Sequence, residues 1–181
     1  MKDTSFFVPK EKQHRVATCY VTDFTTHALS QFDGPRDGQW STPPAFPSGA
    51  AGLVSTVDDL LAVGQLLLGE SASAKRALSP ASIAMMTTDH LSSTTRPRWG
   101  PKGEYFESHG FGFCMSVVTR PNDEPGSVGT FGWDGGYGTT WSCDPREGMV
   151  SILMTQAMWM TPNPPNVAQD FRTSAYQALA D

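Results

Sequence analysis

The residues with the clearest chemical potential are 133–138, which read Trp-Asp-Gly-Gly-Tyr-Gly. The glycines at 135, 136 and 138 carry no side chain, so the backbone there can approach a substrate closely. A second interpretation is a glycine-rich strand end with a bulge, in which Trp133 packs in the core. Taken by themselves, the residues leave both interpretations open.

Other side chains give weaker indications of chemistry. Ser48 lies in Pro-Ser-Gly, without the G-x-S-x-G turn that exposes a nucleophilic serine. The four histidines show no metal-ligand spacing, and the three cysteines include no C-x-x-C pair. We therefore predict no metal and no cofactor.

The composition excludes several function classes. The formal net charge is −5, and the 13 lysines and arginines are scattered, so nothing favours nucleic-acid binding. No apolar run approaches the roughly 20 residues that a membrane span needs. The first residues lack the apolar region and cleavage site of a signal peptide, and the sequence does not decide between cytoplasm and periplasm.

The elements that must position these residues are helices followed by strands. A first helix begins at Ser55 or Thr56, with acidic residues in its first turn, and ends at Gly69. A second begins at Ser79-Pro80 and fades near Asp89. The β-prone segments are residues 14–22, 27–32, 111–119, 128–133, 139–143 and 149–156, and a final helix covers residues 167–178. This order predicts an α+β fold with an antiparallel sheet.

Three segments resemble the serine β-lactamase and penicillin-binding-protein superfamily, in its class C β-lactamase and family VIII carboxylesterase branch. They are Met1-Lys-Asp-Thr-Ser-Phe6, Gly52-Leu-Val-Ser-Thr56 and the stretch 129–145, and they follow the family's order along the chain. The resemblance implies a partial β-lactamase/transpeptidase-like fold. It makes residues 1–181 the carboxy-terminal part of such a domain, with a helical and loop region to about residue 110 and the strands and terminal helix in residues 111–181.

The resemblance also implies a site. Family members acylate a serine, and a K-T-G or W-G-G motif on an edge strand lines the pocket. Trp133-Asp134-Gly135 occupies that position here, so these residues would contact substrate and the Gly136 N–H would be one oxyanion donor. Asp134 replaces the usual small residue, and its charge would oppose an oxyanion unless strand alternation points it away. Tyr137 would line the pocket or pack at its rim.

The remaining family motifs are absent from these 181 residues: no serine precedes a lysine by three positions, and there is no Y-x-N or S-x-N. We therefore expect a carboxy-terminal portion of a serine hydrolase that is inactive alone, with small esters or β-lactam-like amides as substrates of the complete enzyme. Trp133 at the position of the K-T-G lysine favours esters by resemblance. For the hydrolase, the missing amino-terminal half would be the partner. The alternative is a non-catalytic module that associates with itself or binds a partner strand through an unpaired sheet edge.

Overall fold

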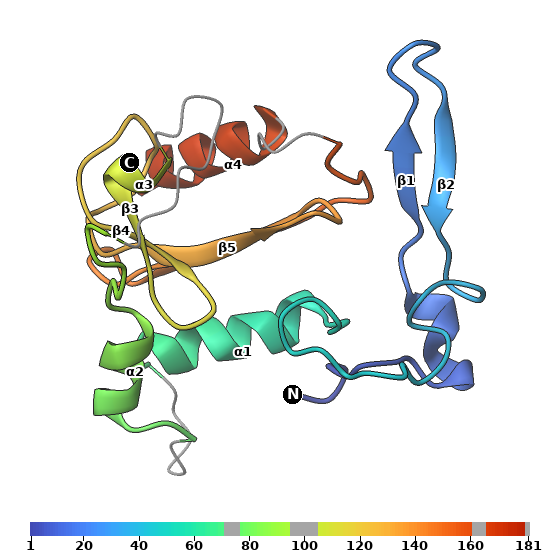
Figure 1. The fold of residues 1–181 in the computed structure, drawn as a ribbon, viewed down its shortest axis with the longest axis horizontal. Coiled ribbons are helices and arrows are strands. Elements are labelled where there is room, and N and C mark those ends of the chain that lie inside the picture. The colour runs from blue at the N-terminus through green and yellow to red at the C-terminus, as the bar shows by residue number, and fades with distance from the viewer. Residues whose placement is uncertain (71–76, 95–104, 161–165, 180–181) are drawn as a thin grey trace.

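A five-stranded antiparallel sheet forms the centre of the molecule, with a helix on each face (Figure 1). The computed structural model describes residues 1–70, 77–94, 105–160 and 166–179. The strands follow one another in chain order, so the sheet is a meander. They are β3 (His109–Phe111), β4 (Ser116–Val118), β5 (Phe131–Gly135), β6 (Thr139–Asp144) and β7 (Met149–Met154). Figure 1 shows α1 (Val57–Leu67) below the sheet and α4 (Asn166–Gln177) above it, and the predicted α+β fold is confirmed.

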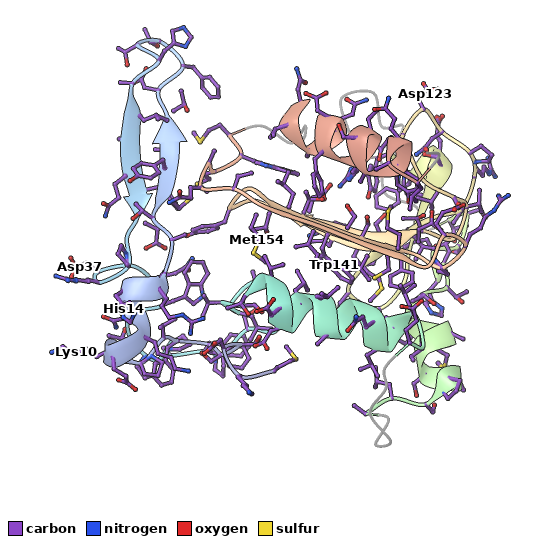
Figure 2. The ribbon with its side chains drawn as sticks, turned by 180° about the vertical axis from the view of Figure 1, so that it is seen from behind. Lys10, His14, Asp37, Asp123, Trp141 and Met154 are labelled. Carbon is purple, nitrogen blue, oxygen red and sulfur yellow. The ribbon has the colours of Figure 1, made fainter. Side chains whose placement is uncertain are left out.

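The register of β5 against β6 decides which side chains share a face. Trp133 lies opposite Trp141, and Asp134 lies opposite Thr140. Because successive residues of a strand point to opposite faces, these two pairs project to different sides of the sheet. Trp141, labelled in Figure 2, lies on the side that faces α1. Trp133 therefore faces the α1 side as well, and Asp134 faces α4.

Helix α1 forms where the sequence predicts it. The Thr56 hydroxyl accepts the Asp59 N–H at 3.3 Å and caps the first turn, and Gly69 ends the helix with φ at +80°. Gly64 lies directly against β7, since a Cβ there would stand 2.7 Å from Val150 Cγ1. The buried core beside the helix consists of Leu67, Met115, Val117, Phe131 and Cys143.

The amino-terminal residues pack beside the start of α1. Ser5 and Val54 exchange two backbone hydrogen bonds, of 3.1 and 3.0 Å. The Asp59 carboxylate accepts the N–H groups of Lys2 and Asp3 and the hydroxyl of Thr4. Two of the segments that carry the resemblance, 1–6 and 52–56, are therefore direct neighbours.

A separate two-stranded hairpin stands beside the main sheet (Figure 1). Its strands are β1 (Cys19–Thr22) and β2 (Leu29–Asp33), which confirms two of the predicted strands. It meets the main sheet just after β7, where the Tyr20 N–H donates to Gln156 O at 2.7 Å and Tyr20 O accepts from the Met158 N–H at 2.8 Å. Residues of the hairpin that follow this contact are mostly exposed.

Several predicted boundaries were wrong. A short 3-10 helix, η1 (Lys10–Arg15), occupies the start of the segment 14–22 that was predicted as strand. The predicted strand 111–119 is two strands, β3 and β4, with a turn between them. A one-turn helix, α3 (Tyr105–Ser108), ends the predicted loop 90–109, of which residues 95–104 lie outside the described residues. Helix α2 (Pro80–Met86) ends three residues before the predicted end.

Within the described ranges, no helix is long and apolar enough to cross a bilayer. The division of the chain near residue 110 stays a prediction.

Candidate active site

The centre of the candidate site is the tight turn between β5 and β6, residues 135–138. The Gly138 N–H donates to Gly135 O at 3.0 Å and closes the turn. Gly138 has φ at +79°, and a Cβ on it would stand 2.2 Å from Ala157 O. Only glycine fits this position, because both the backbone conformation and the space exclude a side chain.

Gly136 presents an open backbone N–H. Its residue is exposed, an added Cβ would meet nothing within 4 Å, and its N–H donates to no residue in the described part of the chain. The Gly135 carbonyl belongs to the same peptide unit and is held by the Gly138 N–H. Because the C=O and N–H of a trans peptide point in opposite directions, that hydrogen bond fixes where the Gly136 N–H points.

A second backbone contact holds the other side of Gly136. Its carbonyl accepts the Trp159 N–H at 2.8 Å. The residue is therefore fixed on both flanking peptides while its donor stays open to solvent. This arrangement, a positioned and unsatisfied N–H, is what stabilisation of an oxyanion requires.

Trp133 lies two residues before Gly135 on the α1 side of the sheet. It is 37% exposed and contacts Phe111 edge to face, with ring centroids 5.3 Å apart. The interpretation that buries Trp133 fully in the core is thus wrong. A partly exposed indole on the strand that leads to Gly136 forms a flat apolar surface beside the turn.

Asp134 points to the opposite face of the sheet, as strand alternation allows. Its carboxylate contacts Arg172 Nη2 of α4 at 2.5 Å. The same nitrogen donates to Thr140 Oγ1 at 2.7 Å, and Arg172 Nη1 lies 3.5 Å from Glu124 Oε2. The carboxylate therefore does not share the face of Trp133, and its charge is compensated by the guanidinium.

Tyr137 connects the turn to the end of β2 and to the loop that follows it. Its ring meets Phe32 and Trp40 edge to face, and its hydroxyl donates to Asp33 Oδ2 at 3.1 Å and accepts from Gln39 Nε2 at 2.6 Å. Burial, followed by the Asp33 carboxylate, raises the pKa of Tyr137 to about 12. The phenol stays protonated at neutral pH and packs at the rim of the turn.

The five predicted site residues, 133–137, are consecutive in one strand and its turn, but the side chain of Asp134 lies on the opposite face of the sheet from Trp133. Sequence reasoning missed the groups that hold them, chiefly Arg172, Trp159 and Asp33. No short-range spacing marks these residues, because each contact joins segments far apart in the chain.

A pocket lies elsewhere in the molecule. An apolar hollow of about 240 Å³ between α1 and α2 is lined by leucines of α1 together with Leu78 and Ile83. Helix α2 is at the opposite end of β5 from the Gly136 turn (Figure 1), so this hollow is not part of the candidate site. Among the described residues, no cluster of three or more potential metal ligands occurs.

Comparison with known proteins identifies the family. The beta-lactamase family model matches residues 1–172. The chain belongs to the beta-lactamase family. Protein Rv1367c of Mycobacterium tuberculosis is 36% identical over 162 residues, which are 86% of this chain and 40% of that protein. Esterase EstB of Burkholderia gladioli is 28% identical over 120 residues, 65% of this chain and 28% of EstB.

Two solved structures share this fold. EstCE1, a hydrolase with promiscuous acyltransferase activity, matches with a TM-score of 0.74 at 23% identity, over 97% of this chain and 47% of its own. Unliganded simvastatin synthase LovD of Aspergillus terreus matches with a TM-score of 0.78 at 17% identity, over 98% of this chain and 47% of its own. The chain is a member of a hydrolase family and spans less than half the length of these relatives.

Proposed function

We propose that this chain is the carboxy-terminal portion of a serine hydrolase and forms one wall of a site that cleaves small esters through an acyl-serine. The open, oriented Gly136 N–H is the observation that carries the proposal. When a serine oxygen attacks the ester carbonyl, the electron pair moves to the carbonyl oxygen, and the Gly136 N–H donates a hydrogen bond to it. Trp133 and Gly135 line the pocket beside that oxygen.

The nucleophile and its proton acceptors lie outside these 181 residues in this proposal, since the sequence contains neither S-x-x-K nor Y-x-N. The lone chain is then inactive, and hydrolysis returns when the polypeptide encoded upstream in frame is supplied. The indole at the position of the K-T-G lysine removes a cation from the site. This favours neutral esters over the anionic β-lactams that a lysine would attract.

The test uses the chain together with that upstream polypeptide, with p-nitrophenyl butyrate and nitrocefin as substrates. Gly136→Pro removes the N–H, whereas Gly136→Ala keeps it and places a methyl group where nothing stands within 4 Å. We expect Gly136→Pro to lower kcat for the ester about 100-fold or more, the usual loss for one oxyanion donor, and Gly136→Ala to stay within a few-fold of wild type.

Equal rates for the proline and alanine variants would overturn the role of Gly136. Ester turnover by the lone chain that survives Gly136→Pro and Trp133→Ala would overturn the whole proposal. Faster hydrolysis of nitrocefin than of the ester would contradict the substrate class.

One observation favours the alternative of a self-associating or partner-binding module. Strand β7 is the last strand of the sheet, and within the described residues it pairs only with β6. Its sequence, Met-Val-Ser-Ile-Leu-Met, has no charge or proline, the features that normally protect an exposed sheet edge. Light scattering during size-exclusion chromatography separates the two: dimers support the module, and a stable monomer argues against it.

A further inference from the structure

Arg172 is a charged residue held almost entirely inside the molecule. It lies on α4, its side chain is only 15% exposed, and it contacts oxygens from three other segments. Those oxygens belong to Asp134 of β5, Thr140 of β6 and Glu124 of the loop between β4 and β5. Burying a guanidinium costs free energy unless its N–H groups have such partners. These contacts therefore fix the position of the Arg172 side chain on the α4 face of β5.

The contact falls at one particular point of the hairpin. Asp134 and Thr140 are directly opposite each other, and a single guanidinium nitrogen contacts both. The next pair is Gly135 with Thr139, and beyond it lies the turn that carries the Gly136 N–H. Arg172 therefore holds the two strands together at the last side-chain pair before Gly135.

The turn is held by backbone hydrogen bonds and by the contacts of Tyr137, and its glycines add no side-chain packing of their own. Gly135, Gly136 and Gly138 have no side chains to pack, and glycine permits a wide range of backbone angles. An N–H that stabilises an oxyanion must nevertheless be oriented before the reaction, by neighbours whose own positions are fixed. On the α4 face of the β5–β6 hairpin, those neighbours are Asp134 and Thr140.

We propose that Arg172 is a positioning residue that holds the Gly135–Gly136 peptide in its donor orientation by joining Asp134 to Thr140 at the base of the turn. The inference rests on the proposed role of Gly136. Arg172 also compensates the Asp134 carboxylate, the one formal negative charge between Trp133 and Tyr137, which would otherwise oppose a developing oxyanion.

The test reads the turn directly in the ¹⁵N-labelled 181-residue chain. Exchange of the Gly138 N–H reports on the Gly135 carbonyl, and exchange of the Trp159 N–H reports on the Gly136 carbonyl. We expect Arg172→Met to displace the Gly136 amide resonance and to speed exchange at both positions about tenfold or more, as loss of a local hydrogen-bonded unit does. Arg172→Lys keeps the positive charge but loses the planar guanidinium that contacts several oxygens, so it should give smaller changes in the same amides.

Two further variants keep the outcome decisive. Arg146→Met removes an arginine that is 80% exposed in the turn after β6, and it should leave the three amides unchanged. Asp134→Ala removes the oxygen that Arg172 contacts, and it tests the contact if Arg172→Met does not fold. The inference is overturned if folded Arg172→Met or Asp134→Ala alters only α4 and Thr140 and leaves Gly136, Gly138 and Trp159 as in wild type.

Hydrolysis by the complemented enzyme separates this inference from the proposed function. We expect Arg172→Met to lower kcat about tenfold with little change in KM, since it disturbs an interaction made in the transition state. If Arg172→Met displaces the turn while Gly136→Pro hydrolyses normally, the proposed function fails and the positioning inference stands. If Gly136→Pro abolishes turnover while Arg172→Met moves no turn amide, the inference fails and the proposed function stands.

Discussion

The two faces of the central sheet are held to their helices by different physical forces. Toward α1, the contacts are apolar and close, with Gly64 against Val150 and Cys143. Toward α4, they are polar and directional, with Arg172 and Tyr176 bonded to carboxylates of the sheet. Apolar burial depends on area and tolerates sliding, whereas hydrogen bonds fix angle and register. The α1 face therefore mainly sets the spacing of the layers, whereas the α4 face sets the orientation of individual strand residues.

The largest expected effect lies on the polar face, at Asp144. This buried carboxylate accepts the Ser127 N–H at 2.9 Å, the Arg146 N–H at 2.9 Å and the Tyr176 hydroxyl at 2.8 Å. Asp144→Ala leaves these donors without their acceptor, and we expect a loss of about 3 kcal/mol in the free energy of unfolding. Urea unfolding measures it. The exposed Asp123, labelled in Figure 2, provides the control Asp123→Ala, which should change little.

On the apolar face, the free energy of unfolding should depend on side-chain volume at the contact between α1 and β7. Gly64→Val places branched carbons where a Cβ alone is already 2.7 Å from Val150 Cγ1, and we expect a loss of about 2 kcal/mol from overpacking. Ala62→Val, on the exposed side of α1, measures the cost of a β-branched residue in this helix. Val150→Ala in the Gly64→Val background should recover part of the loss; no recovery would mean that the spacing of the layers is not set at this contact.

Acid should weaken the polar contacts before the apolar ones. Burial alone would raise the pKa of Asp144, but the hydrogen bonds from Tyr176 and Ser127 outweigh it and hold that pKa below the ordinary 3.8. The Asp3 N–H and the Thr4 hydroxyl likewise lower the pKa of Asp59. A lowered folded-state pKa adds stability that is fully present above the ordinary value and is lost as pH falls through the folded value.

Thermal melts between pH 7 and pH 2.5 measure this loss. We expect the melting temperature to fall mainly below pH 4, and Asp144→Asn, which cannot ionise, to show a shallower slope over the same range. An identical slope for wild type and Asp144→Asn would contradict the lowered pKa of this carboxyl group.

The smallest effect is expected at the rim of the candidate site. Tyr137→Phe removes a hydroxyl that bonds Asp33 and Gln39 but keeps the ring contacts with Phe32 and Trp40. We expect a loss of about 1 kcal/mol in unfolding free energy, the usual net value of such a bond. Tyr20→Phe is the matched control. A loss as large as that of Asp144→Ala would mean that the Tyr137 hydroxyl contributes as much to the free energy of unfolding as the buried carboxylate does, and would contradict its placement at the rim of the site.

Helices with local signals could be predicted from the sequence. Thr56 and Ser79 cap α1 and α2 as expected, because a capping hydroxyl needs only a donor three residues away. The turn between β3 and β4 was missed for an equally local reason. It places Cys114 at φ +66°, a conformation that glycine or asparagine would have marked and cysteine does not.

The position of the candidate site could be predicted from the sequence, but the residues that hold it in place could not. The glycines of residues 135–138 marked the turn, and strand alternation allowed Asp134 to point away from Trp133. Nothing near Asp134 indicated that it would meet Arg172, 38 positions later in the chain. The same holds for Tyr137 and Asp33, which are 104 positions apart. Such contacts depend on the packing of whole layers, which no local pattern encodes.

These long separations have a consequence for the order in which the chain becomes structured. The turn at 135–138 is bonded to residue 33 on one side and, through β5, to residue 172 on the other. Contacts between distant residues form late, because closing a long loop costs entropy before the contact returns any stability. During synthesis the hairpin β5–β6 can pair before α4 has left the ribosome, but the contact of Asp134 with Arg172 can form only after residue 172 has emerged. The part of the molecule nearest the proposed chemistry therefore gains its supporting contacts later than the hairpin that carries it.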